Sequence, residues 1–212
     1  MSGLFITFEG TEGSGKSTQI SLLANRLRAQ GRKVRTLREP GGTPIGEEIR
    51  HTLKHSPANH GMTPETELLL LAASRAQLVR EVIRPALEAG EIVLCDRFYD
   101  STIAYQAYGR QLDLKMVEAI IEVAVGKTIP HLTFLLDISA ATSQQRMQKR
   151  SSGAPGVRDR FEEADQEFFA RVADGYKALA AAEPARVKRL DAERNPEEVG
   201  ATIWQGVEPM LK

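Results

Sequence analysis

Short apolar or β-prone runs alternate with longer amphipathic stretches along the whole chain. The runs predict strands at residues 4–8, 33–38, 92–95, 132–136 and 187–190. Apolar residues at helical spacing predict helices at residues 20–27, 45–54, 64–90, 101–108, 114–125, 140–150, 163–182 and 196–211, and residues 55–64 predict a loop. Five strands that alternate with helices are typical of an α/β fold, in which a mainly parallel sheet carries helices on both faces.

The polar residues that follow the predicted strands should meet at one edge of this sheet. Gly10, Glu39, Asp96 and Asp137 lie at or just past strand ends. Right-handed crossovers bring the carboxyl ends of parallel strands to the same edge, and ligands of such sheets bind there. The sequence therefore predicts a single rim that carries the chemistry.

Residues 10–17 read Gly-Thr-Glu-Gly-Ser-Gly-Lys-Ser and fit the phosphate-loop pattern G-x-x-x-x-G-K-[ST]. They lie between a predicted strand and a predicted helix, which is the context that the pattern requires. Glycines let the backbone turn its N–H groups toward phosphate oxygens, and the start of the helix adds partial positive charge. The alternative is an ordinary glycine turn with a surface lysine. We predict nucleotide binding by Gly10, Thr11, Glu12, Gly13, Ser14, Gly15, Lys16, Ser17 and Thr18.

Three residues near this loop suggest a metal and a phosphate contact. The Ser17 hydroxyl is placed to ligate Mg²⁺ in a phosphate loop, and a carboxylate at a neighbouring strand end, here Asp96, helps to hold that ion. A helix cap or a structural ion pair is the alternative role for Asp96. Arg97 comes next, and a guanidinium can bind a phosphate through two parallel hydrogen bonds.

Five motifs in a fixed order resemble those of the bacterial thymidylate kinases over nearly the whole chain. They are the phosphate loop, Arg-Glu-Pro-Gly-Gly-Thr at 38–43, Ala-Ser-Arg at 73–75, D-R-F-x-x-S-x-x-A-Y-Q at 96–106, and Asp-Arg-Phe-Glu at 159–162. The resemblance implies a phosphate-loop NTPase fold with strand order 2-3-1-4-5, a lid at about 146–160, and one domain over 1–212. It also implies Mg²⁺-dependent transfer of the γ-phosphoryl group of ATP to dTMP, which yields ADP and dTDP for dTTP biosynthesis.

The resemblance assigns the acceptor site residue by residue. Arg38 and Arg97 would hold the dTMP phosphate, Arg75 and Gln106 would contact the thymine, and Tyr105 would crowd the 2′ position of the sugar. The implied set is Arg38, Glu39, Leu71, Arg75, Arg97, Ser101, Thr102, Tyr105 and Gln106. At Leu71 the chain departs from the family, which usually has a phenylalanine that stacks on the base; the loss of the aromatic contact is about 0.5–1.5 kcal/mol.

The lid of this chain is rich in arginine, whereas residues 11–14 contain none. This is the bacterial pattern, in which the lid supplies the arginine that reaches the phosphates. We expect Arg150 in that role, with Arg158 and Arg160 as alternatives, and we expect Lys16, Arg97, Arg150 and Glu12 to be the catalytic residues. The acceptor phosphate has a second pKa of about 6, so its oxygen is largely deprotonated near neutral pH and we expect no general base.

Net charge and hydropathy bear on whether the protein binds nucleic acid or a membrane. The 28 basic residues balance the 28 acidic residues, so nothing in the net charge attracts a nucleic-acid polymer or a membrane. We find no signal peptide and no apolar run near the ~20 residues of a membrane span, and we expect a cytoplasmic protein. The resemblance implies a homodimer, with the apolar helix at 68–82 as a candidate contact.

Three other functions compete with a thymidylate kinase. A GTP-dependent switch protein would need the motifs D-x-x-G and N-K-x-D, and neither occurs. A nucleic-acid-dependent ATPase would need a basic stripe, which the neutral charge balance does not suggest. A kinase that acts on dUMP, on AMP or on a nucleoside is the nearest alternative, and only an assay with each acceptor separates it.

Overall fold

The computed structural model describes residues 3–151 and 165–211, apart from the side chains of residues 150 and 151. Its sheet has the order β2-β3-β1-β4-β5. The strands are β1 (Leu4–Glu9), β2 (Val34–Arg38), β3 (Ile92–Asp96), β4 (Leu132–Asp137) and β5 (Val187–Asp191). Every neighbouring pair is parallel. The predicted α/β class and strand order are therefore confirmed.

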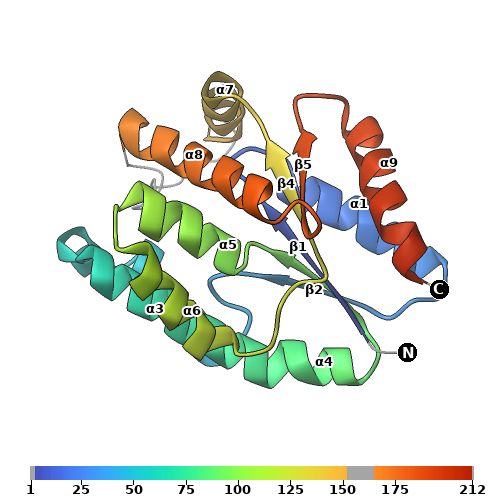
Figure 1. Cartoon of the computed structure of the whole chain (residues 1–212), viewed down its shortest axis with the longest axis horizontal. Helices are drawn as coiled ribbons and strands as arrows, with labels where there is room; N and C mark the ends of the chain where they lie inside the picture. The colour runs from blue at the N-terminus through green and yellow to red at the C-terminus, as the bar shows by residue number, and fades with distance from the viewer. Residues whose placement is uncertain (1–2, 152–164, 212) are drawn as a thin grey trace.

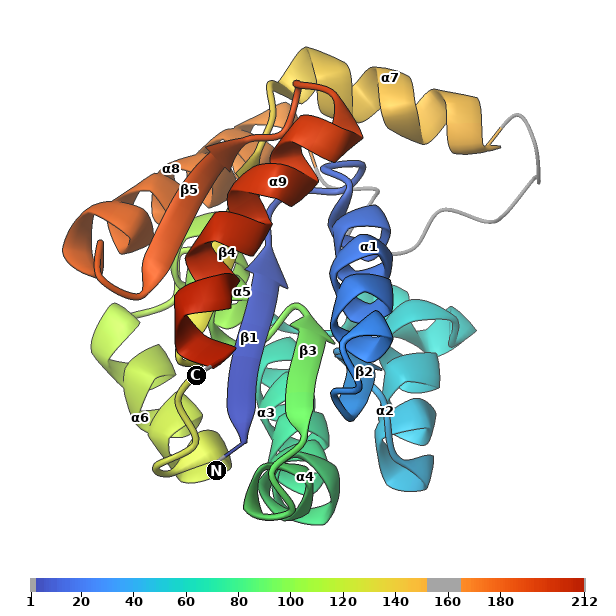
Figure 2. The ribbon, with the colours of Figure 1, turned by 90° about the vertical axis from the view of Figure 1, so that its right-hand side faces the viewer.

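Helices cover both faces of this sheet (Figures 1 and 2). Side chains alternate between the faces of a strand, so neighbouring residues of β1 enter different cores. Ile6 and Phe8 pack with α1 (Lys16–Ala29) and α9 (Pro196–Val207). Phe5 packs on the other face with α3 (Pro64–Leu78), α4 (Arg84–Glu88) and α6 (Leu114–Val125). A third cluster joins Leu135 to α8 (Gln166–Ala182).

The helix predicted for residues 64–90 is divided before Pro85. A π turn, η2 (Val79–Ile83), lies between α3 and α4. Proline has no N–H group to donate to the carbonyl four residues earlier, so the regular hydrogen-bond ladder is interrupted at this point. The wider π turn η2 lies directly before this interruption. Leu68, Leu71 and Leu78 face the core as the spacing predicts.

Several shorter elements differ from the sequence pattern in detail. The loop predicted at 55–64 contains a 3-10 turn, η1 (Pro57–Gly61), and the helix predicted at 101–108 is α5 (Tyr99–Thr102) followed by a π turn, η3 (Ile103–Gly109). The remaining elements are α2 (Pro44–Lys54), α7 (Ala140–Ser151) and η4 (Glu208–Leu211). The α8 helix begins at Gln166 because the Asp165 carboxylate accepts from the backbone N–H of Phe168. None of the helices described combines the length and the apolar character needed to cross a bilayer.

A buried ion pair joins Arg186, the residue before β5, to Asp100 of α5. The Nη1 and Nη2 atoms of Arg186 each lie 2.7 Å from an Asp100 carboxylate oxygen, and Nη1 also donates to Thr133 Oγ1 at 2.8 Å. Arg186 and Asp100 are 8% and 1% exposed. Because both charges are sheltered from water, removing one of them leaves the other without compensation.

We expect Arg186→Ala to lower the free energy of unfolding by about 3–5 kcal/mol, because Asp100 would be left as an unpaired buried charge. Arg189→Ala, three residues further along and within β5, is the matched control. Its partner Asp137 and its own side chain are 32% and 54% exposed, so the expected loss is below about 1 kcal/mol. Urea denaturation at pH 7 measures both. Equal losses in the two variants would contradict the assignment of stability to the buried pair.

Candidate active site

The phosphate loop follows β1 and opens directly into α1. Gly10 and Gly15 have φ angles of 136° and 93°, which non-glycine residues rarely adopt. A side chain on Gly10 would also overlap the carbonyl oxygen of Leu136. The first N–H groups of α1, which begins at Lys16, have no carbonyl partner within the helix. The loop therefore has the backbone geometry of an anion site at a helix start, and anion binding there stays a prediction.

Lys16 lies over this loop and is 6% exposed. Its Nζ atom donates to the carbonyl oxygens of Gly10 and Thr11 at 3.1 and 3.0 Å. Burial, and after it the charge of Arg97, lower the pKa of Lys16 to about 8, although Glu12 and Asp96 oppose this. An anion beside the ammonium would favour its charged form, so the site is electrostatically suited to phosphate.

Ser17 and Asp96 meet across the gap between α1 and β3. The Ser17 hydroxyl donates to Asp96 Oδ2 at 3.0 Å. A hydroxyl and one carboxylate fit Mg²⁺, which prefers oxygen ligands and takes most of its coordination from water and substrate phosphates in such sites. Among the residues described, no cluster of three or more histidine, cysteine or acidic side chains forms a separate metal site.

A cavity adjoins the phosphate loop and collects most of the predicted acceptor residues. Eight of the nine line it, together with Glu12: Glu39, Leu71, Arg75, Arg97, Ser101, Thr102, Tyr105 and Gln106. The ninth, Arg38, lies outside the lining. Its guanidinium bonds the Glu47 carboxylate at 2.9 Å and the Pro40 carbonyl at 3.2 Å, and its side chain is 49% exposed. A phosphate contact by Arg38 would require it to leave Glu47.

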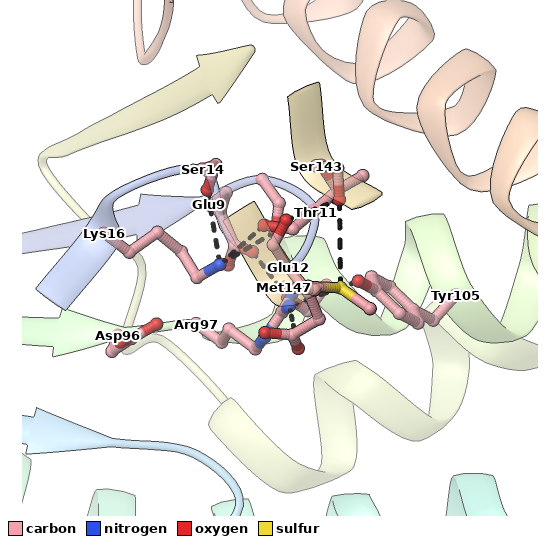
Figure 3. A network of polar contacts seen from close by, with 12 residues as sticks. Glu9, Thr11, Glu12, Ser14, Lys16, Asp96, Arg97, Tyr105, Ser143 and Met147 are labelled. Carbon is pink, nitrogen blue, oxygen red and sulfur yellow. Dashed lines mark hydrogen bonds and ion pairs between the residues drawn. The ribbon is translucent and has the colours of Figure 1, made fainter. Parts of the chain in front are cut away.

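Arg97 lies beside Glu12 of the phosphate loop (Figure 3) and also lines the cavity. Its Nη2 atom bonds Glu12 Oε1 at 2.8 Å and the Tyr105 hydroxyl at 3.1 Å, and its Nη1 atom bonds Ser101 Oγ and the Tyr176 hydroxyl at 3.1 and 3.2 Å. The backbone of Arg97 has a φ of 68°, an uncommon value for a residue with a side chain. These four hydrogen bonds fix the Arg97 guanidinium at the junction of the phosphate loop and the cavity.

Glu9 lies beneath this group, and the sequence reasoning missed it. Its carboxylate accepts from the backbone N–H of Phe98 at 2.7 Å, from the Tyr176 hydroxyl at 2.9 Å and from Ser101 Oγ. Burial, and after it the charge of Asp100, raise the pKa of Glu9 to about 7. Glu9 thereby orients the two hydroxyls that hold Arg97. A carboxylate at the end of an otherwise apolar strand was the signal that could have identified it.

Glu12 is the direct ionic partner of Arg97. The Arg97 charge lowers the pKa of Glu12 well below its usual value, against the effect of burial, and the charges of Lys16 and Lys54 act in the same direction as Arg97. Lys54 also lines the cavity and was not predicted. Helical spacing puts it on the same side of α2 as Glu47 and Arg50, which contact the 38–42 segment. That spacing could have identified it.

All three guanidinium nitrogens of Arg75 donate hydrogen bonds to protein acceptors. Its Nε atom donates to Glu39 Oε2 at 2.7 Å, Nη1 to Thr102 Oγ1 at 2.9 Å and Nη2 to the Phe98 carbonyl at 3.2 Å. Burial raises the pKa of Glu39, against the opposing charge of Arg75. Glu39 Oε1 is buried without a hydrogen-bond partner among the described residues. This end of the cavity is therefore rigid and has an unused acceptor in its wall.

The first part of the predicted lid contacts the phosphate loop. Arg146 of α7 donates to the Gly13 carbonyl at 3.2 Å and to the Ala192 carbonyl at 3.1 Å, and Ser143 Oγ donates to the Glu12 carbonyl at 2.6 Å. The side chain of Arg150, and the whole of Arg158 and Arg160, lie outside the described residues. The described start of the 146–160 segment, at Arg146, therefore contacts the phosphate loop.

Known proteins resemble this chain over almost its full length. It matches the family described as thymidylate kinase over residues 8–203. A thymidylate kinase from Deinococcus radiodurans is 50% identical over 205 residues, which cover 97% of this chain and 96% of the relative. One from Exiguobacterium sp. is 49% identical over 197 residues, with 93% and 90% covered. The crystal structure of thymidylate kinase from Ehrlichia chaffeensis gives a TM-score of 0.78 at 32% identity, with 98% and 99% covered.

We expect Glu9 to make stability fall as the pH rises from about 4.5 to about 7. Its pKa is raised from 4.5 in the unfolded chain to about 7, so the folded state keeps a proton that the unfolded state has already released. The stabilisation is complete below pH 4.5 and is lost as the pH passes 7. Urea denaturation of the wild type and Glu9→Gln between pH 5 and pH 8 isolates this contribution. Parallel stability curves would refute it.

Proposed function

The chain belongs to the thymidylate kinase family, and on this premise we propose how its residues transfer the γ-phosphoryl group of ATP to dTMP to give ADP and dTDP. The observation that carries the proposal is the position of Arg97, which bonds Glu12 of the phosphate loop and lines the adjoining cavity. ATP binds at the loop, dTMP binds in the cavity, and one guanidinium serves both. Release of ADP is then expected with dTMP and not with AMP or thymidine.

The acceptor site divides into a charged part and a base-binding part. Arg97, with Ser101 beside it, binds the dTMP phosphate, and Tyr105 lies along the sugar. Arg75, Gln106 and the apolar side chain of Leu71 surround the thymine. Support comes from the cavity lining, which contains all of these residues, and from the rigid bonding of Arg75 and Arg97. Thr102 and Glu39 hold Arg75 in place.

Phosphoryl transfer in this site depends on position and on charge compensation. Two anionic phosphates approach each other, and Lys16 and Arg97 reduce their repulsion from opposite sides. The oxygen of the acceptor phosphate is mostly deprotonated near neutral pH, so proton removal needs no dedicated residue. Glu12, the resting partner of Arg97, gives up part of this contact when the acceptor phosphate binds.

Ser17 and Asp96 are the residues that would hold Mg²⁺. The ion supplies charge compensation at the β and γ phosphates. Ser17 contributes a hydroxyl ligand, and Asp96 contributes a carboxylate, either to the ion or to its bound water. Removal of divalent ions with a chelator should stop turnover, whereas binding of dTMP alone, at the separate cavity, should persist.

The remaining proposals follow from the family. Arg150 is the lid arginine that reaches the phosphates, and Arg158 and Arg160 are its alternatives. The protein acts as a homodimer in the cytoplasm. An exposed leucine on α3, Leu69 at 57%, and an exposed valine on α6, Val123 at 77%, give this side of the molecule apolar surface suited to a second copy.

We expect Arg97→Ala to lower kcat with dTMP by about 100-fold or more, because the guanidinium stabilises charge at the reacting phosphates. The control Arg189→Ala removes an exposed arginine and should retain normal turnover. A coupled assay of ADP release measures both variants, and circular dichroism verifies their fold. Near-normal turnover in a folded Arg97→Ala protein would refute the role of Arg97.

We expect Leu71→Phe to lower KM for dTMP by roughly 2- to 10-fold, since an aromatic ring would stack on the base. Leu22→Phe is the matched control, because it adds the same ring at an exposed position of α1. Steady-state kinetics with dTMP as the varied substrate measure the change. A raised KM in Leu71→Phe alone would show that the cavity has no room for the ring and would contradict the placement of thymine over residue 71.

A further inference from the structure

Glu67 is a buried carboxylate that lies behind the cavity and not in its lining. It is fully buried in the first turn of α3. Its Oε1 atom accepts from Gln106 Nε2 at 2.9 Å and from Arg110 Nε at 3.1 Å, and its Oε2 atom accepts from Arg110 Nη2 at 3.0 Å. Gln106 lines the cavity and is 1% exposed. Glu67 thus contacts a cavity residue without itself lining the cavity.

The chemistry of Glu67 decides which way the Gln106 amide points. A carboxylate that is ion-paired with a guanidinium has acceptors only, so it must receive an N–H from the amide. Turning the amide by 180° would place its carbonyl oxygen against a carboxylate oxygen at hydrogen-bond distance, and the two would repel. The amide orientation therefore follows from the identity of its partner.

Because the amide nitrogen of Gln106 bonds Glu67, the amide oxygen remains available to a ligand in the cavity. Within the described part of the chain, the hydrogen bond of the Gln106 side chain is the one to Glu67, and it uses the nitrogen. The buried side-chain oxygens without a partner there belong to Gln19 and Glu39, and Gln106 Oε1 is not among them. The cavity, which Gln106 lines, gives access to this oxygen. A ligand in the cavity therefore meets a hydrogen-bond acceptor whose orientation cannot reverse.

We propose that Glu67 is a specificity-positioning residue, which locks Gln106 as an acceptor and so admits a pyrimidine with an N3–H donor and rejects one whose N3 is a lone pair. Thymine and uracil carry the donor, and cytosine presents the lone pair. The inference rests on the proposed function, in which Gln106 faces the base. With cytosine, the N3 lone pair would face the Gln106 oxygen. No hydrogen bond forms between two acceptors, and both groups lose their contact with water.

The test compares dTMP with dCMP in the wild type and in Glu67→Gln. An amide at position 67 can offer either its oxygen or its nitrogen, so Gln106 is free to turn toward either base. We expect the ratio of dTMP to dCMP, in kcat/KM and in Kd from calorimetry, to fall by about 10-fold or more. A ratio equal to that of the wild type would overturn the proposal, because a purely structural role weakens both nucleotides alike.

Two further variants keep the outcome interpretable. Arg110→Lys is the matched control, since it disturbs the same buried ion pair but leaves the carboxylate on Gln106, and its ratio should stay at the wild-type value. If Glu67→Gln does not fold, the double variant Glu67→Gln with Arg110→Met removes both charges and carries the same expectation. A changed ratio in Arg110→Lys would count against Glu67 as the determinant.

Gln106→Leu separates this inference from the proposed function. If it lowers the ratio and Glu67→Gln does not, Gln106 contacts the base without the help of Glu67, and only the inference fails. If Gln106→Leu also leaves the ratio unchanged, Gln106 does not contact the base, and the proposed acceptor site is wrong.

Discussion

The placement of Arg97 is the constraint on which the rest of the site depends. A guanidinium sheltered from water must be surrounded by acceptors, and under the proposed function it must also bind a phosphate. Here the carboxylate of Glu12 gives the ionic contact, and hydroxyls of Tyr105, Ser101 and Tyr176 complete the shell. Hydroxyls are weak enough partners to be exchanged for phosphate oxygens, which bind guanidinium more strongly. The resting shell thus holds the cation in place without removing its affinity for an anion.

The parallel sheet brings these groups together although they are far apart in the chain. Asp96 of β3 lies beside Phe8 of β1 and beside Arg38 of β2 in the strand register. The residues that follow each strand therefore leave the sheet at one rim, where the phosphate loop, Arg97 and Glu39 meet. Tyr176 reaches the Arg97 guanidinium from α8. The site needs the complete fold, because no single segment contains its donors and acceptors.

The sequence allowed the sheet, the phosphate loop and most cavity residues to be predicted, because these depend on local pattern or on motifs. Arg97 follows a strand end, and this alone puts it on the rim. Glu9, Glu67 and Tyr176 were missed because each acts through a partner 39 or more positions away in a different element, and spacing along the chain does not reveal such pairs. Arg38 was expected to contact the dTMP phosphate, and in the structure its side chain pairs with Glu47 on the next helix, a partner that the motif does not reveal.

The pairing of charges in the cavity suggests how one site can bind an anion and still discriminate between neutral bases. Three guanidinium groups at or behind the cavity each pair with a carboxylate: Arg97 with Glu12, Arg75 with Glu39, and Arg110 with Glu67. The Glu12 side chain is 22% exposed, against 3% for Glu39 and 0% for Glu67. Under the proposed function, the acceptor phosphate competes with Glu12, the most exposed of the three carboxylates, for Arg97. The other two carboxylates are buried and hold their neighbours in fixed orientations. Charge would then select the phosphate at Arg97, whereas fixed dipoles would select the base beside Gln106.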